Sequence, residues 1–85
     1  MTEDQLLSEL SQTTGMSAQE WADFLACTTE QQALMVEGYR AQSWAQSAST
    51  LERVIAILQT AASIAVPIGA IAGAGGAVIA LAKLL

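Results

Sequence analysis

The 85-residue chain contains no histidine, one cysteine and one proline. Without histidine it lacks the usual general base near neutral pH and the usual zinc ligand. The lone Cys27 rules out an internal disulfide and metal-ligand spacing. We therefore expect it to be a small buried hydrophobic residue, with an intermolecular disulfide or a reactive thiol as the alternatives. No catalytic constellation is visible. We therefore expect a protein that is not an enzyme and that binds no metal, no cofactor and no small-molecule substrate.

Basic residues are also scarce. Three Lys and Arg stand against eight Asp and Glu, which gives a net charge of −5, and all the acids lie within residues 1–52. Such a chain repels phosphate backbones, so nucleic acid is not an expected partner. Only 13% of the residues are charged and 53% are hydrophobic, against about 25% charged in an ordinary soluble domain. The excess apolar surface must be covered by a bilayer or by other subunits.

Residues 1–48, which we call the head, predict an acidic group of short amphipathic helices. Helices are expected over 1–14 and 16–27, because Thr2 with Gln5 and Ser17 with Glu20 stand in capping-box register. Gly15 is expected to end the first of them. Helical spacing then brings together the apolar residues of a small head core: Leu6, Leu10, Trp21, Phe24 and Leu25.

A third helix is expected over 28–46, capped by Thr28 with Gln31 or by Thr29 with Gln32. Its expected packing residues are Leu34, Met35, Tyr39 and Trp44. Gly38 inside it indicates either a close helix crossing or simple tolerance. Tyr39 and Trp44 admit two interpretations, ordinary packing or aromatic anchors at a membrane interface.

Residues 49–85, which we call the tail, predict a hydrophobic C-terminal helix or a helical hairpin. Ser49 with Glu52 forms a capping-box match that opens a helix near residue 50. The run Val54–Ala82 then contains no charged residue. Pro67 removes a backbone donor and clashes with the preceding turn, so it kinks the helix or ends it. The sequence leaves both possibilities open.

Small residues recur in the tail at four-residue spacing. On a helix they form a ridge with almost no side chains, which a second helix can approach closely. The ridge consists of Ala61, Ala65, Gly69, Gly73 and Ala77. It predicts tight helix–helix packing and a homo-oligomer, although an Ala-rich composition produces such spacing by chance as well. The glycines do not form a dinucleotide-binding loop, because Val78 occupies the sixth position counted from Gly73.

The uncharged run of 29 residues exceeds the length of about 20 that crosses a bilayer once. The first functional hypothesis is therefore a self-associating, membrane-active protein: a tail-anchored, pore-like or holin-like subunit located in a membrane. The alternative is a structural subunit of a homo-oligomeric assembly, such as a virion, that buries its tail against protein. Lipid is an expected partner only under the first hypothesis.

The chain resembles small phage-encoded holin-like and minor virion proteins in its architecture. The resemblance rests on a short acidic head, with T-E-Q-Q-A-L-M-V-E-G-Y-R, followed by a Gly/Ala/Ile-rich tail. It implies action on a host membrane or a part in virion assembly and assigns no role to single residues. Holins more often end in a charged segment than in Lys83-Leu-Leu85.

Overall fold

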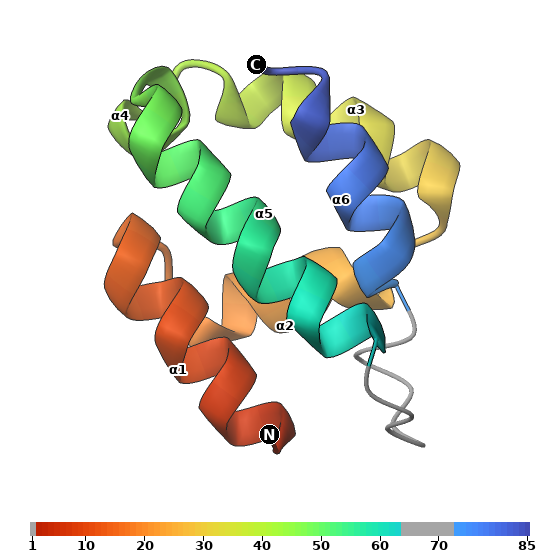
Figure 1. The fold of residues 1–85 in the computed structure, drawn as a ribbon. Coiled ribbons are helices and arrows are strands. Elements are labelled where there is room, and N and C mark those ends of the chain that lie inside the picture. Colours follow the sequence, from red (N-terminus) through yellow and green to blue (C-terminus); the bar gives the residue numbers. More distant parts are fainter. Residues whose placement is uncertain (1, 64–72) are drawn as a thin grey trace.

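The computed structural model describes residues 2–63 and 73–85 of the chain, and all the regular secondary structure in these ranges is helical (Figure 1). The all-α prediction is therefore confirmed. The six described helices are α1 (Glu3–Thr14), α2 (Ala18–Ala26), α3 (Thr29–Tyr39), α4 (Ser43–Gln46), α5 (Ala48–Ser63) and α6 (Ala74–Ala82).

The first three helices begin where the capping residues predict. Complete capping boxes join Thr2 to Gln5, Ser17 to Glu20, and Thr28 to Gln31. For α3 the Thr28 alternative is therefore correct. Gly15 ends α1 with φ of +81°, the left-handed conformation that glycine adopts at little cost, and its N–H donates to the Ser11 carbonyl.

The predicted helix over 28–46 was wrong as a continuous element, because it is broken into α3 and α4. At the break the Gln42 N–H donates to the Tyr39 carbonyl at 2.8 Å. Gln42 then has an extended backbone, and its Oε1 accepts a hydrogen bond from Trp44 Nε1 at 2.7 Å. The turn directs Trp44 into the core, where it is buried.

Two further expectations about these elements were wrong. Leu34, expected to pack, is 76% exposed, because α3 turns Gln32 and Val36 to the interior instead. The tail helix α5 begins at Ala48 rather than after a Ser49 cap. Ser47 takes the capping position, since its Oγ accepts from the Thr50 N–H at 3.4 Å. Gly38 is exposed, and an added Cβ would meet no described atom within 4 Å, which agrees with simple tolerance.

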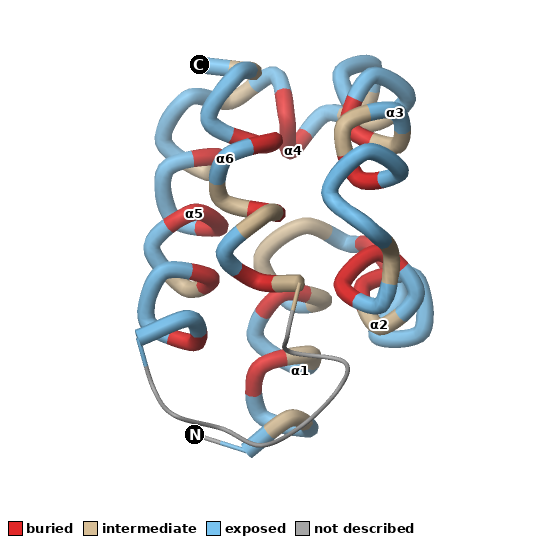
Figure 2. The backbone as a smooth tube through the Cα atoms, turned by 90° about the vertical axis from the view of Figure 1, so that its right-hand side faces the viewer, coloured by how far each residue is buried: buried red, intermediate tan, exposed pale blue. Residues whose placement is uncertain are grey.

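Head and tail share one hydrophobic core. Helix α5 packs against α1 and α4, while α6 packs against α3 and α5. Helices α5 and α6 lie side by side and antiparallel (Figure 1), which is the hairpin arrangement of the tail. The buried positions of the helices face inward (Figure 2), and residues of both parts form a single cluster. Pro67, the expected kink, lies outside the described residues.

Candidate functional site

The most unusual element is α6, since its nine residues, Ala74–Ala82, include no charged or hydrogen-bonding side chain. One face of the helix is buried and consists of Ala74, Ala77, Ala80 and Leu81. The opposite face reaches the surface with Gly75, Ala82 and Ile79, of which Ile79 is 61% exposed. A helix in an aqueous protein normally turns polar side chains outward. The outer face of α6 is therefore an apolar surface that no other described residue of the chain covers.

Two glycines let the start of α6 approach the head closely. A Cβ added at Gly73 would overlap the main-chain carbonyl oxygen of Leu25, at the end of α2. A Cβ added at Gly76 would lie 2.8 Å from Gln32 Oε1 and 3.0 Å from Thr29 Oγ1, both on α3. Gly75 has no such neighbour within 4 Å. We call the surface of the head that Gly73 and Gly76 approach, formed by Leu25, Thr29 and Gln32, the α6 seat.

Gln32 is the polar centre of the seat and is completely buried. Its Nε2 donates to two carbonyl oxygens, that of Phe24 at 3.0 Å and that of Gly73 at 3.2 Å. One side chain thus joins the end of α2 to the beginning of α6. Its Oε1 has no hydrogen-bond partner among the described residues. A buried acceptor without a donor costs about 1–3 kcal/mol, so the docked position of α6 includes an unfavourable contribution.

The ridge residues predicted for helix–helix contact divide into two groups. Ala61 and Ala77 are buried within the chain's own core, and Gly73 opens α6 at the seat. Ala65 and Gly69 lie outside the described residues. The described part of the ridge therefore packs inside one chain, between α5, α6 and the head.

The importance of Gln32 was missed at the sequence level, although a signal for it exists. Gln32, Val36 and Tyr39 recur at i, i+4 and i+7, which places the amide on the inward stripe of α3.

The predicted head-core residues are all buried; Leu6, Leu10, Trp21 and Phe24 have no exposed surface, and Leu25 is 1% exposed. Trp21 and Phe24 pack edge to face with ring centroids 5.7 Å apart. The indole N–H of Trp21 donates to Thr14 Oγ1 at 2.9 Å. This arrangement holds α1 against α2, and α1 in turn packs against the tail helix α5.

Tyr39 and Trp44 extend the aromatic cluster, their ring centroids lying 6.0 Å apart and each within 6.4 Å of Trp21. Both thus take part in ordinary packing. Burial raises the pKa of the Tyr39 phenol to about 12, and the charges of Glu20, Cys27 and Asp23 add to this effect. Tyr39 therefore remains protonated at physiological pH and serves as a packing residue.

Cys27 is half-buried rather than fully buried. Its Sγ lies 3.1 Å from the Asp23 carbonyl oxygen and 3.6 Å from Met35 Sδ. Within residues 2–63 and 73–85, no three His, Cys, Asp or Glu side chains come together as metal ligands would.

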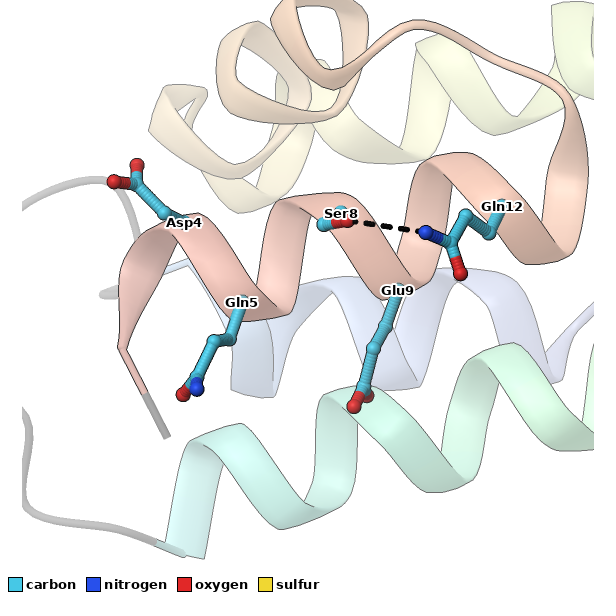
Figure 3. Close-up of a pocket in the computed structure, with 5 residues that line it drawn as sticks. All are labelled: Asp4, Gln5, Ser8, Glu9 and Gln12. Atoms are coloured by element: carbon cyan, nitrogen blue, oxygen red, sulfur yellow. Dashed lines mark hydrogen bonds between the residues drawn. The ribbon is translucent and has the colours of Figure 1, made fainter.

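The described part of the surface includes two shallow hollows. One, of about 470 Å³, runs along a face of α1 and is lined by Asp4, Gln5, Ser8, Glu9 and Gln12 (Figure 3). In it the Gln12 amide donates to Ser8 Oγ at 3.4 Å. The other, of about 360 Å³, is lined by Thr13, Ser49, Thr50 and Arg53. Their linings are mostly exposed polar side chains, an ordinary feature of solvated helices. We place the candidate site at α6 and its seat.

Among the described helices, none combines the length and the apolar character that a membrane crossing requires. Comparison of the chain with known protein families, curated proteins and solved structures gave no match.

Proposed function

We propose that this protein is a non-enzymatic structural subunit that self-associates through its tail, as in a homo-oligomeric or virion assembly. The observation that carries the proposal is the composition of α6. Ile79 is 61% exposed on a helix whose outer face offers water no polar side chain. Covering such a face with protein removes apolar area from water, which favours association by about 25 cal/mol per Å².

Charge supports a second copy as the partner. The chain carries a net charge of −5, yet all its acids lie in residues 1–52 and none lies on α6. Two α6 faces can therefore meet without direct repulsion between carboxylates. A stable interface buries about 800 Å² per partner, and a helix of nine residues is only about 14 Å long at 1.5 Å per residue. The contact must therefore involve more than the outer face of α6.

A second candidate function is membrane activity, with the tail inserting into a bilayer as in holin-like or pore-like subunits. The observation that favours it is the uncharged run Val54–Ala82, which is longer than one bilayer crossing needs. The architectural resemblance to small phage-encoded proteins is compatible with both candidates. The two differ in what covers the tail, protein or lipid.

Light scattering during size-exclusion chromatography tests self-association, and Ile79→Lys with Leu34→Lys is a matched pair of variants. Both residues are large, apolar and exposed, at 61% and 76%, but they lie on different helices. We expect the unmodified chain to form a defined oligomer without detergent, Ile79→Lys to weaken it at least tenfold, and Leu34→Lys to leave it unchanged. A single-chain mass at every concentration would refute the proposal.

Flotation with phosphatidylcholine vesicles tests the second candidate in the same preparations. The self-association proposal predicts that the oligomer stays in the vesicle-free fraction. Recovery of the protein with the vesicles, abolished by Ile79→Lys, would support membrane activity in its place.

A further inference from the structure

We infer that subunits of this protein associate by exchanging α6, so that the α6 of one copy occupies the α6 seat of another. The inference rests on the proposed self-association and specifies how it occurs. It concerns the seat formed by Leu25, Thr29 and Gln32 and the small-residue face of α6 that fills it.

The seat is built entirely from residues that precede the tail. Leu25 lies in the last turn of α2, Thr29 and Gln32 lie on α3, and Gly73, the N-cap residue of α6, follows 41 positions after Gln32. A second copy carries an identical α6. It can therefore make the same bond from Gln32 Nε2 to the Gly73 carbonyl and the same close approach at Gly76.

The side-chain oxygen of Gln32, which has no hydrogen-bond partner among the described residues, supports α6 as the exchanged element. Gln32 is fully buried, and its Oε1 points to the place where Gly76 lacks a side chain, 2.8 Å from an ideal Cβ there. The buried face of α6 offers three alanines and one leucine, whereas α5 buries Leu51, Val54, Ile55 and Leu58. Opening of α6 therefore uncovers smaller apolar side chains than opening of α5 would, and segments of low local stability open before the whole fold does.

Exchange also explains how a small apolar face can favour a dimer. The contacts at the seat are the same in the monomer and in the exchanged dimer, so they do not decide between the two states. A modest additional contact is then enough to favour the dimer. The face with Gly75, Ile79 and Ala82 is uncharged and exposed, which suits it to that contact even though it is too small to hold two closed subunits together.

A disulfide across the seat tests the exchange directly. The Thr29 Cβ and an ideal Cβ at Gly76 lie 3.8 Å apart, close to the mean of about 3.8 Å in disulfides. The Gly76 side chain would displace only the end of the Gln32 side chain. In a Cys27→Ser background, one chain carries Thr29→Cys and another carries Gly76→Cys, and the two are mixed, unfolded, refolded together and oxidised.

Exchange predicts a disulfide between the two chains, seen as a dimer-sized band in a denaturing gel that disappears on reduction. The matched control replaces Gly76→Cys by Gly75→Cys, since a Cβ at Gly75 meets no described atom within 4 Å. We expect at least a tenfold lower yield of the mixed disulfide from this pair. Equal yields from both pairs would overturn the exchange.

A chain that carries both Thr29→Cys and Gly76→Cys distinguishes a failure of the exchange from a failure of self-association. If light scattering shows a dimer while the disulfide forms within each chain, exchange is refuted and self-association stands. If the mass is that of one chain throughout, self-association itself fails.

Should the variants not fold, as judged by circular dichroism, the unmodified chain provides the test. In a mixture of isotopically labelled and unlabelled chains, exchange predicts an intermolecular nuclear Overhauser effect between the Gln32 amide and the Gly73–Ala77 turn, and its absence from a dimer overturns the inference.

Discussion

Gln32 and Gly73 are 41 positions apart in the sequence, yet the amide nitrogen of the first lies 3.2 Å from the carbonyl oxygen of the second and donates to it. The same nitrogen donates to the Phe24 carbonyl. Through this side chain, the end of α2, the interior of α3 and the start of α6 are fixed relative to one another. The start of α6 is thus bonded to a polar side chain inside a core whose other described buried residues are apolar.

Replacement of Gln32 by methionine should change the free energy of unfolding by no more than about 1 kcal/mol. The two lost hydrogen bonds are worth about 1 kcal/mol each, and removal of the unpartnered Oε1 returns a similar amount. Both carbonyls also retain a donor, Cys27 N for Phe24 and Ala77 N for Gly73. Gln32→Ala, which leaves a cavity, should cost about 2 kcal/mol or more. Urea unfolding followed by far-ultraviolet circular dichroism measures both, and a loss as large for methionine as for alanine would contradict this account.

Adjacent glycines of α6 should respond in opposite directions to alanine. Gly75→Ala should raise the free energy of unfolding by about 0.5–1 kcal/mol, because the new methyl group meets nothing and the unfolded chain loses entropy. Gly76→Ala should lower it by about 1–3 kcal/mol, because its Cβ crowds Gln32 and Thr29. Thermal and urea unfolding of the two variants provide the comparison. Equal stabilisation by both would mean that α6 does not occupy the seat.

Loss of the Thr14 hydroxyl should destabilise the head. Thr14 Oγ1 accepts from the buried Trp21 indole and from the Met16 N–H, and it donates to the Leu10 carbonyl at 2.7 Å. Thr14→Val leaves the indole N–H without its acceptor and should cost about 1–3 kcal/mol. Thr13→Val, one position away and half-exposed, should change stability by less than about 0.5 kcal/mol. A similar cost for both variants would show that the hydrogen bond is not responsible.

Alkaline pH should weaken the fold through Tyr39. Its pKa is raised from 10.0 to about 12 in the folded chain, so the unfolded chain loses the phenol proton first. The stabilisation from this group is complete below pH 10 and is lost as the pH rises through about 12. Tyr39 is the sole tyrosine, so tyrosinate absorbance follows it directly. Tyr39→Phe should show a smaller fall in stability over this range, and an identical fall would refute the assignment.

The features that the sequence predicted well are local ones. A capping box involves residues three positions apart, so Thr2, Ser17 and Thr28 could be identified without knowledge of the rest of the fold. The break between α3 and α4 could not, because it depends on Trp44 finding space beside Trp21 in a core made by other helices. Leu34 was misplaced for a related reason. The inward face of α3 contains Gln32 and Val36, and the two acceptors of Gln32 lie 8 and 41 positions away, beyond the reach of a local pattern.

For the candidate site, spacing predicted close helix packing but not the partner. The close approach is shown at Gly73, where an added Cβ would overlap the Leu25 carbonyl oxygen, and Ala61 and Ala77 are buried. Whether the approaching helix belongs to the same chain or to another is a property of the tertiary structure. In this fold Gly73 meets the head, while Ala61 on α5 and Ala77 on α6 are buried in a chain whose α5 and α6 pack against each other.

The aromatic cluster makes the near-ultraviolet and fluorescence signals of the chain specific to the head. All four aromatic residues lie between Trp21 and Trp44, and the tail has none. Their rings are close enough, at 5.5 Å for Phe24 and Tyr39, for their electronic transitions to couple. Near-ultraviolet bands and indole emission therefore originate in the head alone, whereas peptide bands include all the helices. A rearrangement of α6 that left the head packed would therefore not change the near-ultraviolet bands or the indole emission. Of these signals, only the peptide bands could report it.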